Sequence, residues 1–441
     1  MVMVRKLKRI LLGGDQRTSK AKKNILLSIG IKACSILVSL VLVPLTLGYL
    51  NKYEYGIWLT LSSTLMWINY FDIGLGNGLR NKLAEALADS DVKKGQVYIS
   101  TTFALLTIIM VVFYLLYYVC HFFFSWNAIL NISSNELSID LDKLVLFVLL
   151  FFCLNFILKV IGNVYLAKQL SVVNDLMIFV ANVCSCIIIY ILTLTSEGDL
   201  AKVALVYSVS PVVVYLLAYP ITFSYLYKDL APKWSCINFR YSKSLLSLGG
   251  QFFIVQIACL IIFSTSNLFI TQLCSPSEVT VYNIAFKYFS VITMAFIILI
   301  TPFWSAATDA YARKDFAWIK RSVGMMMKFW VLLEAVALIM LFIADYVYNV
   351  WVNLTIPFSL SILMFLYVSI SNWNNLFAYF LNGIGMIKIQ LYCSVIASIL
   401  YIPLAIFLGR MWGMNGVCLA MCIVLFLSSI VLPIQYKKKI I

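Results

Sequence analysis

Long apolar stretches recur along the whole chain and restrict its fold more than any other feature. A helix needs about 20 mostly apolar residues to cross a bilayer. Twelve stretches meet this length. The sequence therefore predicts an all-α membrane protein of about twelve spans, near residues 24–48, 55–77, 97–121, 143–166, 172–194, 201–225, 245–272, 280–305, 322–344, 357–383, 388–409 and 412–435.

Composition supports a membrane environment. Hydrophobic residues make up 63% of the chain and charged residues 12%, whereas a soluble domain carries about 25% charged residues. A net charge of +15 would suggest nucleic acid as the partner of a soluble protein. Here the basic residues lie in short segments between apolar runs, which points to the bilayer and away from nucleic acid.

Basic residues also predict the orientation. If the N-terminus lies in the cytoplasm, 25 of the 33 Lys and Arg residues fall in cytoplasmic segments and four in outside loops. Such an asymmetry places both termini inside. The first apolar run is too long for a cleaved signal peptide and is expected to remain as the first span.

The sequence repeats itself after 224 residues. Glu54 aligns with Glu278, and Asp91 aligns with Asp315. Six spans per copy would keep both copies in the same orientation, which predicts two parallel six-helix lobes related by pseudo-two-fold symmetry. The expected divisions are a basic N-terminal segment, an N-terminal lobe, a cytoplasmic linker, a C-terminal lobe and a basic tail, at 1–23, 24–225, 226–244, 245–435 and 436–441.

The sequence lacks the residue patterns that several kinds of chemistry require. Gly13 and Gly14 are not followed by a phosphate-binding loop pattern. His121 is the one histidine, and the eleven cysteines show no zinc or disulfide spacing. We therefore expect no cofactor and no metal, and an energy source other than ATP bound by this chain.

Polar residues recur at helical spacing within four of the predicted spans. Polar groups inside a membrane are costly and usually face a bundle interior or a wet cavity, and steps of three or four place them on one helix face. The four stripes are Asn24, Ser28, Lys32, Ser35 and Ser39; Asn155, Lys159 and Asn163; Asn283, Lys287 and Ser290; and Asn372, Asn375, Tyr379 and Asn382.

These residue types indicate the cargo chemistry. A lysine ammonium suits phosphate oxygens, and Asn side chains offer donors and acceptors to sugar hydroxyls. The alternative is that the lysines extend to the headgroups and that Ser and Asn join helices to each other. Polar neighbours on the same face favour a cavity for Lys32 and Lys287, whereas Lys328 fits the headgroup alternative.

Glu334 is an acid near the middle of the ninth predicted span. It could neutralise Lys287 on the preceding span or carry a proton as the ion-coupling group, and an acid inside a membrane is a functional candidate in either case. Asp175 lies at a span end and is expected to be solvated.

Two segments resemble a known family. The segments FDIGLGNGLRNKLAEALADSD (71–91) and VYNIAFKYFSVITMAFIILITPFWSAATDAYARKD (281–315) are similar to segments of Wzx-type polysaccharide flippases. These proteins belong to the multidrug/oligosaccharidyl-lipid/polysaccharide exporter superfamily. The resemblance implies two lobes that alternate between inward-open and outward-open states in a bacterial inner membrane.

The resemblance also implies a cargo and its site. The cargo would be an undecaprenyl-diphosphate-linked O-antigen or capsule unit, with a glycan polymerase and a chain-length regulator as candidate partners. Lys32 and Lys287 match by position the cationic cavity residues of relatives, and Arg80 lies at the cytoplasmic mouth. The roles of Lys159, Glu334 and the amide residues Asn283, Asn372, Asn375 and Asn382 rest on the polar stripes alone.

Three other functions compete with this one. A drug/cation antiporter of the same superfamily should have an acidic cavity, whereas four lysines lie inside the predicted spans and Glu334 is the one acid near the middle of a span. A membrane enzyme such as a polymerase or acyltransferase would need larger outside loops or more histidine. A non-transporting scaffold would not need polar stripes.

Overall fold

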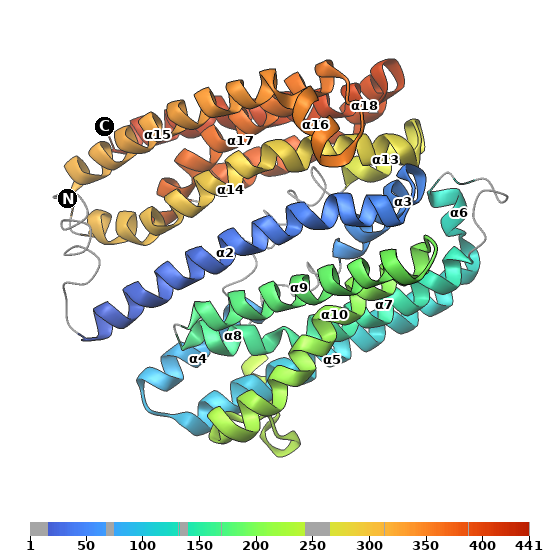
Figure 1. Cartoon of the computed structure of the whole chain (residues 1–441). Helices are drawn as coiled ribbons and strands as arrows, with labels where there is room; N and C mark the ends of the chain where they lie inside the picture. Colours follow the sequence, from blue (N-terminus) through green and yellow to red (C-terminus); the bar gives the residue numbers. More distant parts are fainter. Residues whose placement is uncertain are drawn as a thin grey trace. The chain divides into compact units, whose positions relative to one another are not determined.

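The computed structural model describes residues 16–440 except 68–74, 131, 133–139, 169, 243–264, 313 and 387. Every regular element among these residues is helical (Figure 1). The chain divides into two compact units. Unit 1 comprises Met1–Tyr49, Ile68–Trp126 and Asn135–Gly250, and unit 2 comprises Leu50–Trp67, Asn127–Ser134 and Gln251–Ile441.

Unit 1 is built on long apolar helices. Its main elements are α2 (Gln16–Tyr49), α4 (Leu75–Ala88), α5 (Val92–Cys120), α7 (Leu141–Leu158), α8 (Val160–Ala167), α9 (Ser171–Thr195) and α10 (Leu200–Pro220). Helices α2 and α9 lie side by side. A π-helical turn, η3 (Ile221–Leu226), follows Pro220 and leads into three short turns, η4 (Lys228–Leu230), η5 (Trp234–Cys236) and η6 (Phe239–Tyr241).

Unit 2 combines one helix of the first half with the helices of the second half. Its main elements are α3 (Lys52–Leu65), α13 (Thr265–Leu273), α14 (Pro276–Ala312), α15 (Phe316–Phe342), α16 (Ala344–Val352), α17 (Phe358–Gly383) and α18 (Lys388–Ile440). Helix α18 is interrupted at Trp412 and at Gly413, where φ is +58°. This break agrees with the boundary predicted between spans 388–409 and 412–435.

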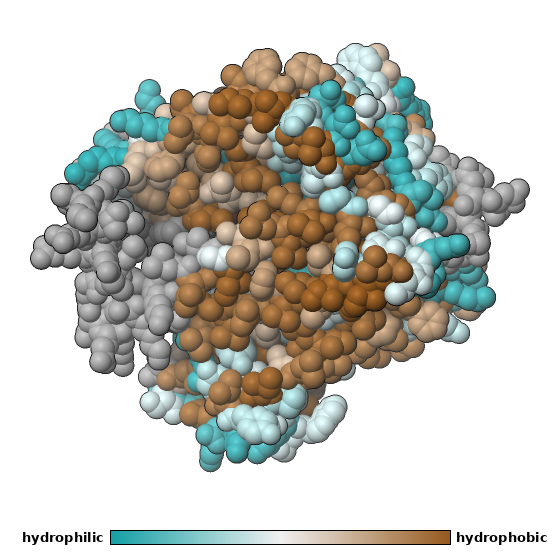
Figure 2. Space-filling view, in the orientation of Figure 1, coloured by the Kyte–Doolittle hydropathy of each residue, from teal (hydrophilic) through white to brown (hydrophobic). Residues whose placement is uncertain are grey.

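Eight described helices are long and apolar enough to cross a membrane: Gly30–Tyr49, Val92–Phe123, Leu141–Ala167, Ser171–Thr195, Leu200–Leu226, Pro276–Thr301, Phe316–Phe342 and Lys388–Lys438. Figure 2 shows hydrophobic residues over much of the visible surface. Lipid-facing positions such as Leu37, Leu217 and Ile339 are more than 60% exposed. The predicted span 245–272 falls largely outside the described residues, and twelve spans with both ends inside stays a prediction.

The internal repeat is visible in the geometry of its turns. Asn51 and Ser275 precede α3 and α14, and each side chain accepts a hydrogen bond from the backbone N–H of the glutamate three residues later. At the other end, Ser90 and Lys314 both have φ of +59°. The aspartate after each, Asp91 or Asp315, accepts a hydrogen bond from the N–H three residues on, at 2.9 Å in both copies.

Helices α3 and α14 cross through residues that the repeat makes equivalent. Thr280 Oγ1 donates a hydrogen bond of 2.7 Å to the carbonyl of Lys52. Gly56, which aligns with Thr280, lies so close to the carbonyl of Pro276, which aligns with Lys52, that a Cβ there would collide with it. The contact is therefore reciprocal, as expected at a two-fold axis. The contact packs α3 against α14, and both helices belong to unit 2.

The two copies differ in the stretch between these ends. In the second copy α14 runs unbroken from Pro276 to Ala312, whereas in the first copy α3 ends at Leu65 and α4 begins at Leu75. In the described residues the predicted span 55–77 corresponds to most of α3 and the start of α4. Segment 68–74 of that prediction lies outside the described residues.

Candidate functional site

Lys32 lies on α2 and forms an ion pair with Asp175 of α9. Lys32 Nζ is 3.6 Å from Asp175 Oδ2, and the side chains are 54% and 11% exposed, respectively. Ser28, one turn before Lys32, donates a hydrogen bond to the same carboxylate. The expectation that Asp175 is solvated is therefore wrong. Ser28 and Lys32, four residues apart on α2, therefore both bind Asp175, a contact that the sequence did not predict.

Lys159 and Arg80 occupy other helices of unit 1. Lys159 lies between α7 and α8, and its ammonium is 4.2 Å from the ring centroid of Phe156, a cation–π contact. Arg80 is exposed on α4. Nearby, Lys82 and Glu85 pair at 2.7 Å, and this hydrogen bond raises the pKa of Lys82 above its ordinary value. Among the described residues no contact joins Lys32, Lys159 and Arg80.

Lys287 is half-buried on α14 in unit 2. Within the described ranges it makes neither an ion pair nor a side-chain hydrogen bond. One turn earlier, Asn283 Nδ2 donates to Asn267 Oδ1 of α13 at 2.8 Å. Asn267 in turn donates to the carbonyl of Leu59 on α3 at 3.4 Å. Asn283 therefore belongs to a network that joins helices, the alternative left open by the sequence.

The amide residues of α17 differ from one another in burial. Asn372 is completely buried, and neither its amide nitrogen nor its oxygen has a partner among the described residues. Asn382 Oδ1 is also buried without a partner there, whereas Asn375 is half-buried. Buried polar atoms are almost always hydrogen-bonded in folded proteins, so Asn372 and Asn382 are suited to bind water or a polar ligand.

Glu334 on α15 faces α17. Its carboxylate accepts a hydrogen bond from Ser369, while Oε1 is buried without a partner in the described part of the chain. Trp330 Nε1 donates to the Ser369 carbonyl at 3.3 Å. No ion pair joins Glu334 to Lys287 among these residues, so the first of the two alternatives, neutralisation of Lys287, is not observed. The unpartnered Oε1 leaves room for a proton, which is the second alternative.

These positions give each unit a lysine within its apolar helices, Lys32 in unit 1 and Lys287 in unit 2. The lysines are suited to bind anionic oxygens and the amides to bind hydroxyls. The described residues contain no cluster of His, Cys, Asp or Glu that could hold a metal ion. Sequence reasoning missed Asp175, Ser369 and Asn267, because each is connected to its partner across a long stretch of chain.

Comparisons with known proteins agree with this picture. Residues 21–308 match the family model described as polysaccharide biosynthesis protein. A putative O-antigen export protein of Yersinia pseudotuberculosis is 22% identical over 81% of this chain and 82% of its own length. A putative O-antigen transporter of Salmonella typhi is 23% identical over 80% of this chain and 81% of its own length.

A solved structure shows the same fold. An inward-facing multidrug resistance MATE family transporter of the MOP superfamily superposes with a TM-score of 0.75. The match covers 94% of this chain and 98% of that protein at 14% sequence identity. At this identity the similarity establishes the fold, an all-helical two-lobe transporter architecture, and not the cargo. Because the family model covers well over half of the sequence, the chain belongs to the polysaccharide biosynthesis protein family.

Proposed function

We propose that this protein flips polyprenyl-diphosphate-linked oligosaccharide repeat units, of the O-antigen or capsular type, across the bacterial inner membrane. Movement runs from the cytoplasmic to the periplasmic leaflet by alternating access and uses an ion gradient. The observation that carries the proposal is the pair of lysines held within apolar helices, one in each unit. The names of the relatives from Yersinia pseudotuberculosis and Salmonella typhi support the same cargo class.

The ion pair of Lys32 suggests how cargo is recognised in unit 1. Lys32 is half-exposed while it pairs with Asp175 at 3.6 Å, so a diphosphate can reach its ammonium. A diphosphate oxygen that binds Lys32 competes with Asp175 for the same charge. Asp175 therefore keeps Lys32 oriented when cargo is absent and is displaced when cargo arrives. Lys287 has no such acid among the described residues and supplies an uncompensated positive charge.

Glu334 is the proposed ion-coupling group. Its Oε1 has no partner among the described residues and can take a proton, and Ser369 can donate to the carboxylate when the proton leaves. If Glu334 carries the proton, Glu334→Gln should retain protein level but lose the dependence of export on the pH gradient. Export by Glu334→Gln that responds to the gradient as the wild type does would assign coupling to another group.

The positive charges also separate this function from that of a cation antiporter. A site for organic cations requires net negative charge, whereas Lys32, Lys159 and Lys287 outnumber Asp175 and Glu334 within the described helices. The fold alone does not decide between them, because transporters of both kinds share it. Glycan polymerase and chain-length regulator proteins are the proposed partners of the flippase.

The test complements a strain that lacks this gene and displays its glycan only when the gene is supplied. Lys32→Ala should reduce surface glycan roughly tenfold or more at equal protein level, since a charged hydrogen bond contributes about 1.5–3 kcal/mol. Lys32→Arg should restore part of it, because the charge remains while the compact ammonium geometry does not. Lys328→Ala is the matched control, since Lys328 is an exposed lysine of α15. Wild-type glycan from Lys32→Ala would refute the role of Lys32.

A further inference from the structure

The segment after α10 is a series of short turns that packs against the surface of α5. Three polar side chains of α5 hold it in place. Gln96 Nε2 donates to the carbonyl of Ala231 at 2.7 Å, Ser100 Oγ accepts from the N–H of Lys233 at 3.0 Å, and Thr101 Oγ1 accepts from the N–H of Asn238 at 3.0 Å. We call residues 228–241 the interfacial shelf.

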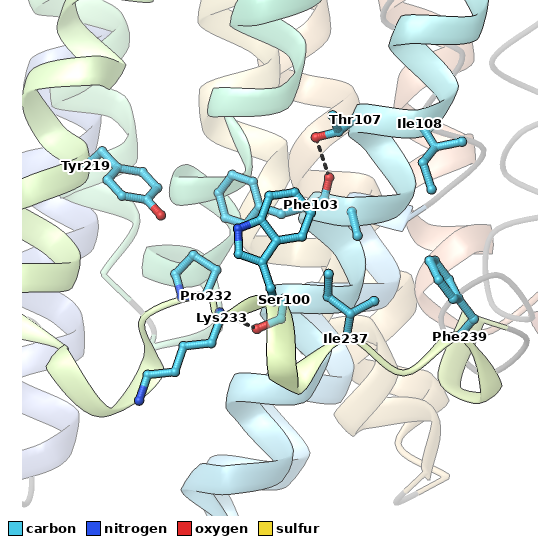
Figure 3. Close-up of a pocket in the computed structure, with 11 residues that line it drawn as sticks. Ser100, Phe103, Thr107, Ile108, Tyr219, Pro232, Lys233, Ile237 and Phe239 are labelled. Carbon is cyan, nitrogen blue, oxygen red and sulfur yellow. Dashed lines mark hydrogen bonds between the residues drawn. The ribbon is translucent and has the colours of Figure 1, made fainter.

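A cavity of about 510 Å³ lies between the interfacial shelf, α5 and α10 (Figure 3). Phe103, Ala104 and Ile108 of α5 form one wall, Tyr219 of α10 contributes a second, and Ile237 and Phe239 come from the shelf. Figure 3 shows these side chains arranged around the same space. The cavity is contained within unit 1.

The two hydroxyl groups that α5 contributes to the cavity wall are already engaged. Thr107 Oγ1 donates to the carbonyl of Phe103 at 2.7 Å, and Ser100 Oγ donates to the carbonyl of Gln96 at 2.7 Å while it accepts from Lys233. The dashed lines in Figure 3 mark the bonds of Thr107 and Ser100 to the residues drawn there. A polar ligand would find few partners in this wall, so the cavity favours an apolar occupant.

The cavity continues into a lipid-facing track. Along α5, exposed apolar residues follow Ile108 at helical spacing: Ile108, Val111 and Val112 are each 50% exposed, and Leu115 is 57% exposed. Phe103 lies about 16 Å along α5 from its first residue, Val92, at the rise of an α-helix. A hydrocarbon chain that enters the cavity can therefore extend along α5 without leaving the apolar region.

The shelf has the composition of a membrane interface. Trp234 is 88% exposed and Phe239 is 51% exposed. Lys228, Lys233 and Arg240 are exposed cations on the same shelf, where Asp229 is the one acid. Exposed Trp is typical of the headgroup region, and clustered Lys and Arg attract anionic lipids.

We infer that the cavity and the interfacial shelf bind one anionic glycerophospholipid, with an acyl chain against Phe103 and Ile108 and the headgroup beside Lys233 and Arg240. A phospholipid fits better than the polyprenyl cargo. The residues proposed to bind the diphosphate, Lys32 and Lys287, are not on the shelf, and the shelf supplies its own cations. The site is thus a lipid site on the outer surface of unit 1, independent of the transport function.

The experiment uses the full chain in nanodiscs of phosphatidylglycerol and phosphatidylethanolamine in equal amounts. Native mass spectrometry measures which lipid remains bound after release. The wild type should retain one phosphatidylglycerol molecule in preference to phosphatidylethanolamine. Ala104→Trp should abolish retention by filling the cavity. Lys233→Gln should lower the preference about fivefold, the effect expected of one surface cation.

Two control variants separate this site from general lipid contact. Ile187→Trp adds bulk to an exposed face of α9 away from the cavity and its track, and Lys202→Gln removes a cation at the start of α10. Both should bind lipid as the wild type does. Lys233→Gln changes an exposed side chain and remains informative if Ala104→Trp does not fold. The inference is overturned if the wild type shows no preference, if both test variants behave like the controls, or if protein extracted from cells holds a polyprenyl lipid in this cavity.

Discussion

Segments 51–94 and 275–318 are two copies of one repeat, and they match at their ends while they differ in between. Both begin with a side chain that caps the helix, and both close with a residue of positive φ followed by a capping aspartate. Yet α14 runs unbroken from Pro276 to Ala312, whereas among the described residues of the first copy α3 ends at Leu65 and α4 begins at Leu75. The turns at the two ends of the repeat are thus retained, while the helices between them have different bounds.

Packing accounts for the continuity of α14. The first copy has Gly76 and Gly78 where the second has Ile300 and Pro302. All four residues are helical, in α4 and α14, although glycine and proline both disfavour a helix relative to alanine, and proline does so more strongly. Ile300 is fully buried with Phe296 in the core of unit 2, so side-chain packing stabilises α14 through this stretch. Gly76 and Gly78 contribute no such side chain to α4.

The proposed cargo contact also differs between the two copies. Lys287 in the second copy aligns with Ser63 in the first, and within the described part of the chain Ser63 donates to the carbonyl of Thr60 on its own helix. The repeat therefore preserves turns and the α3–α14 crossing, and it does not preserve the proposed cargo contact. Four substitutions test whether framework and function are separable in this way.

The largest expected effect comes from Lys287→Ser, which gives the second copy the residue of the first. Export of glycan should fall roughly tenfold to a hundredfold, because a charged contact worth about 1.5–3 kcal/mol is lost. Thermal stability should be nearly unchanged, since Lys287 makes no side-chain hydrogen bond or ion pair within the described ranges. Surface glycan and melting temperature are measured on the same variant. Normal export would show that the lysine is not part of the cargo site.

A smaller effect is expected from Gly56→Ala at the α3–α14 crossing. The added methyl group would meet the carbonyl of Pro276, and the helices must separate, which costs about 1–3 kcal/mol for an overpacked contact. Gly48→Ala is the control, because nothing lies within 4 Å of a Cβ at Gly48. Unfolding in detergent should show a lower melting temperature for Gly56→Ala alone. Equal melting temperatures would mean that α3 does not pack closely on α14 in solution.

The smallest effect is expected at the paired turns. Ser90→Gly and Lys314→Gly each relieve a left-handed conformation in a residue that has a side chain. Each should stabilise the protein by about 1 kcal/mol, the lower end of the cost of that conformation. The comparison predicts similar shifts in both copies. A shift confined to one variant would show that the two turns are not equivalent in the folded protein.

The sequence predicted helices well and connections between helices poorly. Apolar runs predicted spans at 97–121 and 172–194, and the structure has helices at Val92–Cys120 and Ser171–Thr195. Hydrophobic length alone determines such elements. It also predicted a span over 55–77, whereas α3 ends at Leu65, because hydrophobic length does not show where an α-helix ends within an apolar run.

The candidate site shows the same limit. Periodicity placed Ser28 and Lys32 on one face, which the contact of both with Asp175 confirms. It could not identify Asp175 as their partner, because the two helices are separated by more than a hundred residues of sequence. Likewise, Glu334 and Lys287 were considered as a pair because their predicted spans follow each other in sequence. In the structure α15 packs on α17, and Ser369 of α17 donates a hydrogen bond to Glu334. Tertiary packing, not local spacing, decides these pairs.

The central claim is that this protein moves a lipid-linked oligosaccharide between leaflets, and one measurement tests it most directly. In cells lacking the gene and any other flippase, lipid-linked repeat units are labelled by a membrane-impermeant reagent from the periplasmic side. We expect that nearly all units are inaccessible without the protein, become accessible with the wild type, and stay inaccessible with a Lys32→Ala/Lys287→Ser double variant made at the same level. Units that are equally accessible with and without the wild-type protein would contradict it.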